Sequence, residues 1–318
     1  MMNMKSALIP LCLLASIVIL SGCIGGVGGG GVTPGTNGII IKEFGFDYSP
    51  IYSGESTGLT LTLQNVGGEK AILKEIEVFG IDTGTPASST AGTLTWGYGS
   101  GDSFILTGID QELLPPDPTT GFEGEEYFQE WVPESPTGIK SPTTYDFQTR
   151  IKYLYTTTFT GKITVVDDAY LRSLPTDQRE ALIKVGGVQD ASVTGGPLAL
   201  TAASGRNFIL RTGEGGTARS IKFKIANVGS GYPYKDPWSN DNLHIVTVTG
   251  EEGINCSVGT TDADIKLSRG KTGVISCEFT PPVQGTFSNK IDKMFSVTLS
   301  YGYYVDSSAS ITVNPVIE

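Results

Sequence analysis

The side chains with the clearest capacity for chemistry are three acids beside a tryptophan, Glu125, Glu126, Glu130 and Trp131. A pair of carboxylates is the machinery of glycoside hydrolysis, so this set could belong to a carbohydrate-active enzyme. Acidic residues at this density are also typical of a solvated loop or strand face. We favour the solvated face and keep the enzyme as the alternative.

Other catalytic and metal-binding patterns are missing from the sequence. His244 is the single histidine, and its neighbours alternate like a strand, so we expect a surface or edge residue rather than a catalytic or multi-histidine site. No nucleophile-elbow, phosphate-loop or dinucleotide motif occurs. We therefore expect no catalytic residue, no metal and no cofactor. Calcium at the Asp/Asn-rich loops 236–242 and 262–264 stays open, although neither loop has EF-hand spacing.

Aromatic residues gather in two places, with Tyr232, Tyr234 and Trp238 in one and Tyr127 and Trp131 in the other. The first group lies on a segment that two prolines stiffen, and rigid rings are good anchors for a partner. Rings of this kind also cap the ends of β-sandwiches. The two interpretations are core packing and recognition of a surface protein or glycan.

The N-terminus has the layout of a secretory signal, with Lys5 before an apolar run, Ser6 to Leu20. The run ends in Leu20-Ser21-Gly22-Cys23, which resembles the lipobox of prokaryotic lipoproteins. The resemblance implies that residues 1–22 are removed and that Cys23 becomes a lipid-carrying N-terminus. The alternative is a transmembrane anchor with an incidental cysteine. The run is short for a span of ~20 apolar residues, and it contains Pro10.

Of the four cysteines, Cys12 lies in the signal and Cys23 is the expected lipid site. Cys256 and Cys277 remain, both in strand-like surroundings. Outside the cytoplasm such a pair most simply forms a disulfide, and two buried thiols are the alternative.

Charge narrows the class of partner. The chain has 318 residues and a formal net charge of −11, which becomes −12 once Lys5 is removed. No basic run occurs, so we expect no nucleic-acid partner. An acidic protein is repelled by anionic headgroups, so its place at the cell membrane would depend on the lipid at Cys23. We expect an extracytoplasmic location.

The first half reads as a Gly-rich tether, residues 23–38, followed by short strands. Leu59, Leu61 and Leu63 alternate with polar residues and lead into Asn65-Val66-Gly67, which predicts a strand and a turn. Residues 71–79 fit a strand or a helix. Alternating aromatic and apolar residues over 145–155 predict another strand, with 156–165 as its hairpin partner. The irregular region 82–142 is interpreted as a long insertion.

The second half repeats these landmarks. Ile221 to Gly229 matches Leu59 to Gly67 at an offset of 162, and Ile311 matches Ile163 at an offset of 148. Between the halves, residues 167–185 predict a helix that Thr176 would cap. We therefore expect a first β-sandwich at 39–166, a helical connector at 167–195 and a second β-sandwich at 196–318.

The fold class that we predict is all-β, with two tandem antiparallel immunoglobulin-like sandwiches. Alternating strands followed by x-Asn-x-Gly resemble the CARDB-type and related immunoglobulin-like modules of prokaryotic surface proteins. The resemblance implies a binding or structural module without catalytic residues. We expect a lipid-anchored surface protein for adhesion, envelope scaffolding or partner binding. The alternatives are the extracellular enzyme and a subunit of a transporter or surface assembly.

Overall fold

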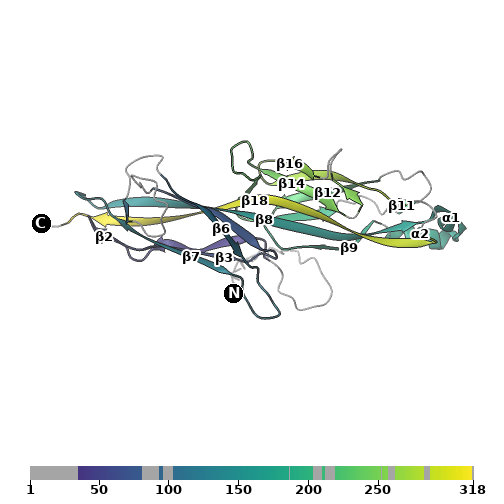
Figure 1. Cartoon of the computed structure of the whole chain (residues 1–318), viewed down its shortest axis with the longest axis horizontal. Coiled ribbons are helices and arrows are strands. Elements are labelled where there is room, and N and C mark those ends of the chain that lie inside the picture. Colours follow the sequence, from purple (N-terminus) through teal and green to yellow (C-terminus); the bar gives the residue numbers. More distant parts are fainter. Residues whose placement is uncertain are drawn as a thin grey trace, which may run out of the picture. The chain divides into compact units, whose positions relative to one another are not determined.

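The structure is a computed structural model that describes residues 35–80, 93–95, 103–185, 187–202, 210–211, 219–251, 253–256, 262–282 and 287–316. Thr33–Glu318 form one compact unit. Its described part is built mainly of strands, with two short helices (Figure 1). The all-β sandwich fold predicted from the alternating strands is confirmed. Cys12 and Cys23 lie outside the described residues.

Two very long strands form the centre of the fold. β8 (Thr143–Val166) and β18 (Lys290–Asn314) pair antiparallel along their whole length, from Thr143 opposite Val313 to Val166 opposite Lys290. Figure 1 shows them side by side through the middle of the sheet. The predicted hairpin between 145–155 and 156–165 is wrong, because both segments belong to β8. The run Thr156–Thr160 offers β-branched residues and no turn residue, so the strand continues.

The main path of the central sheet runs β16-β14-β18-β8-β4-β6. Its other four main-path strands are β16 (Asp262–Lys266), β14 (Ile245–Glu251), β4 (Ala71–Phe79) and β6 (Ser103–Leu113). Four shorter strands pair with β8 or β18, namely β2 (Ile51–Tyr52), β9 (Val188–Val193), β11 (Leu210–Arg211) and β13 (Tyr232–Tyr234). Of the two structures considered for 71–79, the strand is the one formed.

Two four-stranded sheets cover the inner face of the central sheet. The first has the order β1 (Ile39–Phe46), β3 (Leu59–Asn65), β7 (Glu126–Glu134) and β5 (Thr93–Thr95). The second has the order β10 (Leu198–Ala202), β12 (Arg219–Asn227), β17 (Thr272–Phe279) and β15 (Ile254–Asn255).

Rings join each small sheet to the central one. Phe46 of β1 meets Phe147 of β8 edge to face at 5.0 Å, and Phe223 of β12 meets Phe159 of β8 at 5.3 Å. The three leucines of β3 that alternate in the sequence are fully buried. The period-two pattern therefore reports the inner face of each sandwich correctly.

The predicted helix 167–185 is two helices, α1 (Asp168–Ser173) and α2 (Thr176–Val185). Leu174 is extended, as a residue before proline prefers, and the helix breaks there. The Asp167 carboxylate caps α1 by accepting from the Tyr170 N–H at 3.0 Å. Thr176, predicted as the cap of a single helix, is the first residue of α2. Among the described residues, neither helix combines the length and the hydropathy that a membrane span requires.

The strands of the two halves of the chain pair in equivalent registers. Positions in β8 and β18 correspond at an offset of 148, because Ile72 faces Leu154 as Tyr234 faces Gly302. The same offset relates Val165 to Val313, whose partners Leu210 and Ile51 lie on the equivalent short parallel strands β11 and β2. In this correspondence β1, β2, β3, β6, β7 and β8 match β10, β11, β12, β16, β17 and β18. We call β1–β8 the first repeat and β10–β18 the second.

The two repeats differ most at β4. In the first repeat β4 continues past a bulge between Leu73 and Glu75. In the second repeat its counterpart is divided into β13 and β14, with residues 235–244 between them. In the region 82–142, interpreted from the sequence as an insertion, the structure places β5, β6 and β7, which pair within the two sheets of the first sandwich.

Matching turns follow β3 and β12. The Asn65 amide donates to the carbonyls of Glu69 (2.9 Å) and Leu113 (2.8 Å), and its carbonyl accepts from the Gly67 N–H at 3.0 Å. The Asn227 amide bonds Gly231, Gly270 and Gly229 in the same way. The Asn-Val-Gly motif is therefore a side-chain clamp that each repeat uses to hold its own turn.

Candidate functional site

Four rings gather on the outer face of the central sheet, and we call them the aromatic ridge: Tyr232, Tyr234, Trp238 and Tyr304. Trp238 meets Tyr304 edge to face at 5.2 Å and Tyr234 at 5.0 Å, and Tyr232 lies 5.8 Å from Tyr304. Tyr234 is buried, whereas the other three are half-exposed. The sequence pointed to three of these rings. It missed Tyr304, although the alternation of β18 places Tyr304 opposite to the inward-facing Tyr303.

Cations lie over three of these rings. The Arg150 guanidinium is 4.6 Å from the Tyr304 ring centre, the Lys152 ammonium 4.5 Å from the Trp238 ring centre, and the Lys271 ammonium 5.2 Å from the Tyr232 ring centre. A cation on an aromatic face gains about 0.5–2 kcal/mol, depending on how far it is removed from water. These contacts fix the ridge against the sheet.

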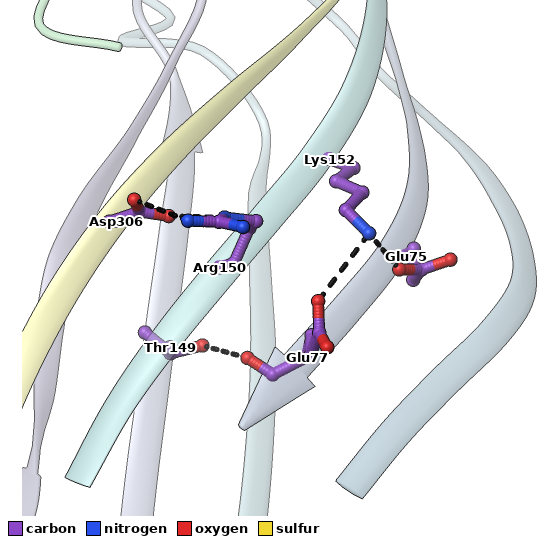
Figure 2. Close-up of polar contacts among 6 residues, drawn as sticks. All are labelled: Glu75, Glu77, Thr149, Arg150, Lys152 and Asp306. Atoms are coloured by element: carbon purple, nitrogen blue, oxygen red, sulfur yellow. Dashed lines mark hydrogen bonds and ion pairs between the residues drawn. The ribbon is translucent and has the colours of Figure 1, made fainter. Parts of the chain in front are cut away.

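Carboxylates hold two of these cations in place, as Figure 2 shows. Arg150 makes a bidentate pair with Asp306, with nitrogen–oxygen distances of 2.8 and 3.0 Å. The Lys152 ammonium, on a side chain only 6 % exposed, lies 2.5 Å from Glu75 and 3.4 Å from Glu77. The hydrogen bond to Asp306 raises the pKa of Arg150. Lys152 therefore sits between two carboxylates of β4 and the indole of Trp238.

Glycine and loop hydrogen bonds explain why the ridge forms where it does. A Cβ at Gly302 would fall 2.2 Å from Tyr234 Cζ, so the bare backbone there lets the Tyr234 ring lie on the sheet. Burial raises the pKa of the Tyr234 hydroxyl. Beyond it, the Lys235 N–H donates to the Asn242 carbonyl at 2.9 Å, and the Asn242 amide donates to the Pro237 carbonyl at 2.8 Å. These bonds close the loop that carries Trp238.

A cavity of about 320 Å³ opens beside the ridge, on the same outer face. Its floor is formed by Ile72, Leu154 and Thr156, and Ser300 and Thr247 continue it across the sheet. Lys70, Lys235 and Asp236 complete its polar rim. Sequence reasoning did not find this cavity, because its residues come from five segments that only the pairing of β8 with β18 brings together.

The other predicted rings do not join the ridge. Trp131 of β7 is 6 % exposed and belongs to the core of the first sandwich. Tyr127 is half-buried on the same strand, where its hydroxyl donates to Gln129 at 3.2 Å and burial raises its pKa. The structure therefore places Tyr127 and Trp131 in a different sheet from Tyr232, Tyr234 and Trp238.

The acids and the histidine have local roles. Glu126 pairs with Lys42 at 2.6 Å, and Glu125 accepts from the Leu114 N–H at 3.0 Å. His244 precedes β14 in a left-handed conformation (φ 65°), with its ring 5.6 Å from that of Tyr232. Burial, with a contribution from Lys266, lowers the pKa of His244. Among the residues that the structure describes, no group of three or more His, Cys, Asp or Glu is arranged to hold a metal ion.

The remaining cysteines, Cys256 and Cys277, lie at disulfide distance, with 2.12 Å between their sulfur atoms. Cys256 follows β15, and Cys277 lies on β17, the strand with which β15 pairs. The pair joins the edge of the smaller sheet of the second repeat, on the opposite side of the core from the ridge.

Comparison with known proteins finds one weak structural likeness and no match in sequence. No protein-family model and no curated protein matches the chain. Among solved structures, the C-terminal globular domain of an oligosaccharyltransferase from Pyrococcus abyssi aligns with 85 % of this chain at 9 % identity and a TM-score of 0.22. The chain spans 46 % of that structure. A likeness at this level carries no functional conclusion.

Proposed function

We propose that this chain is a lipid-anchored, non-enzymatic surface protein that binds a glycan or a surface protein at the aromatic ridge. The observation that carries the proposal is the ridge itself, with three half-exposed rings on the same face as an open cavity. Aromatic rings held rigid by their surroundings lose little entropy when a ligand covers them. This arrangement supports adhesion or partner capture better than catalysis.

The location rests on separate observations. The lipobox-like segment ending at Cys23 supports a membrane anchor, and the Cys256–Cys277 pair supports an oxidising compartment. The acidic net charge gives the body of the protein no affinity of its own for anionic headgroups. In this proposal the lipid holds the protein at the membrane, and the Gly-rich tether lets the ridge face outward.

Mass spectrometry of the membrane-bound form tests the anchor. We expect a chain that begins at Cys23 and carries lipid on it. Retention of Met1, or an unmodified Cys23, contradicts the anchoring.

Binding to a glycan array, and capture of partners from solubilised membranes, test the ridge. Trp238→Ala and Tyr232→Ala should each reduce binding about five- to thirtyfold, because each removes a ring that contributes on the order of 1–2 kcal/mol. Phe128→Ala is the matched control, because this ring is 61 % exposed but lies on β7, outside the ridge. Equal binding by all three variants would contradict the assignment of the aromatic ridge as the binding surface.

A further inference from the structure

The cavity and the Trp238 ring occupy equivalent positions, the cavity in the first repeat and the ring in the second. Trp238 contacts Tyr234, Tyr304, Lys152 and Arg150. Through the repeat offsets of 162 and 148, the counterparts of the first three are Ile72, Thr156 and Ser300. All three counterparts line the cavity.

Among the described residues of the first repeat none corresponds to Trp238, and the cavity is open at that position. The indole comes from the loop 235–244, which divides β13 from β14 in the second repeat. In the first repeat β4 covers the same distance with a bulge between Leu73 and Glu75. One repeat therefore fills this site with its own ring, and the other leaves it free for a ring from outside.

The chemistry of the two sites differs in one consistent way. The polar groups around Trp238 include two cations, Lys152 and Arg150, which suit the face of an indole. They also include Tyr304 and the Lys152 partner Glu75. In the cavity the counterparts of Tyr304, Lys152 and Glu75 are Thr156, Ser300 and Thr247, three hydroxyls, of which that of Thr247 donates to the Asp264 carboxylate at 2.8 Å and can still accept from a ligand. An indole or phenyl ring has too few polar atoms to bond three hydroxyls, whereas a sugar ring carries its own hydroxyls at its edge.

The floor and rim fit the same ligand. Ile72 and Leu154 offer an apolar surface to the face of a ring, and Leu154 takes the place that Gly302 leaves bare in the second repeat. Asp236 at the rim can accept from ring hydroxyls, and Lys70 and Lys235 can donate to them. Both lysines also pair with acids, Lys70 with Glu112 at 2.9 Å and Lys235 with Asp264. A volume of about 320 Å³ is at the small end of ligand sites.

We propose that this cavity binds one pyranose unit of a glycan, with the sugar ring taking the place that Trp238 takes in the other repeat. The inference rests on the proposed binding function and names its ligand class. The apolar face of the sugar lies on Ile72 and Leu154, and its hydroxyls bond Thr156, Thr247 and Ser300. The half-exposed rings of the ridge then lie beside the next sugar units of the chain.

The test uses the full chain in lipid nanodiscs and saturation-transfer NMR with methyl pyranosides of glucose, galactose, mannose and N-acetylglucosamine. We expect at least one of them to bind with a Kd on the order of 1 mM, as for a ligand of about a dozen heavy atoms. Thr156→Tyr copies Tyr304 into the cavity, and Ser300→Lys copies Lys152. Each should weaken pyranoside binding at least about fivefold. Ser308→Tyr, at an exposed position of β18, is the matched control and should bind as the natural chain does.

Several results would overturn the proposal. These are pyranoside binding that is unchanged in both cavity variants, binding of indole but of no pyranoside, and no binding of any pyranoside. Where the array and the capture experiments still give a ligand that depends on Trp238, the ridge function survives and only the cavity assignment falls. Where nothing is captured at all, the binding function itself fails.

Discussion

Leu154 and Gly302 face each other across the β8–β18 ladder, and they are also the same position of the two repeats. The pseudo-twofold axis that relates the repeats therefore passes between them. Leu154 supplies a side chain to the cavity floor, whereas Gly302 supplies none and lets the Tyr234 ring lie on its backbone. This difference at the axis accompanies the loop 235–244, whose Trp238 fills the site in the second repeat.

A leucine at position 302 should expel the ring of Tyr234. Gly302→Leu places a side chain where Tyr234 Cζ lies 2.2 Å from a Cβ, so the ring and the Trp238 loop must shift. We expect a loss of unfolding free energy of about 1–3 kcal/mol, as for overpacking, and a change in tryptophan emission. Urea unfolding followed by fluorescence measures both. Ser308→Leu on the same strand is the control, and equal stability of the two variants would contradict the close packing at Gly302.

The sequence predicts the landmarks of this fold better than its connections. Alternation in Leu59–Leu63 and the Asn-Val-Gly motif identify a strand and its turn in each repeat, because both signals are local. The pairing of β8 with β18 joins segments about 150 residues apart, and no local pattern reports it. Residues 145–155 and 156–165 have the alternation of two hairpin strands, and the missing turn residue between them was the signal for one strand.

Replacing the asparagine of either clamp should destabilise the fold more than replacing most other polar residues. Asn65→Ala leaves the carbonyls of Glu69 and Leu113 and the Gly67 N–H without this partner, in a place where Asn65 is fully buried. We expect about 2–4 kcal/mol of lost stability, from several buried groups at 1–3 kcal/mol each with partial relaxation. Asn227→Ala should cost less, because its bonds match but the side chain is only half-buried. Chemical denaturation measures both, and a loss below about 0.5 kcal/mol in either would show that the clamp is dispensable.

Alkaline pH should unfold the protein through its central tyrosines. Tyr153, Tyr155, Tyr301 and Tyr303 meet at the axis, with neighbouring ring centres 5.8–6.3 Å apart. Burial raises the pKa of Tyr155 and Tyr303 from 10.0 to about 12, and raises those of Tyr153 and Tyr301 well above 10.0. A raised pKa of an acid means that stability is fully present below pH about 10 and is lost as pH rises through about 12.

We therefore expect circular dichroism and tyrosinate absorbance to change together between pH about 10 and 12. Tyr303→Phe should lower stability at neutral pH by about 1–2 kcal/mol, because Asn227 and the Gly231 N–H lose a partner, and should make the alkaline loss of stability less steep. Tyr52→Phe, at a ring 52 % exposed, should change neither. Gradual ionisation of all tyrosines near pH 10 without unfolding would contradict the burial of this cluster.

The cysteine pair should stabilise the second sandwich independently of the ridge. Cys256 and Cys277 are 21 residues apart, and opening a loop of that size costs about 3 kcal/mol in the chain-entropy model. The double variant Cys256→Ser/Cys277→Ser should lower the thermal midpoint and leave ligand binding unchanged. Calorimetry of the natural chain with and without a reductant gives the same comparison. A midpoint insensitive to both treatments would mean that the pair contributes nothing to stability.

For the candidate site too, the sequence reports groups of side chains that are close along the chain but not those that only the fold brings together. Tyr232, Tyr234 and Trp238 are close in sequence and are correctly grouped by it. Tyr127 and Trp131 are also a tyrosine and a tryptophan close in sequence, but both lie on the inward face of β7, so Trp131 is buried in the core. The cavity residues carry no sequence signal, because threonine, serine and leucine are common on strands. Their importance becomes visible only when the structure shows that Trp238 fills the equivalent site in the second repeat.

We expect Lys152 of the first repeat to stabilise the position of the loop 235–244, which carries Trp238 in the second repeat. Its ammonium lies between Glu75, Glu77 and the Trp238 ring, so Lys152→Met leaves two half-buried carboxylates without their cation and leaves the indole with Arg150 as its remaining cation. Removing one member of a buried charge cluster typically costs 3–5 kcal/mol. We expect a loss of about that size, together with a change in Trp238 emission.

The triple variant Lys152→Met/Glu75→Gln/Glu77→Gln should recover part of the loss, because no unpaired charge remains buried. Arg172→Met, at an ion pair on an 80 % exposed side chain, is the control and should cost less than about 1 kcal/mol. If Lys152→Met is no more costly than the control, the Lys152 ammonium contributes nothing to holding the Trp238 loop on the first repeat.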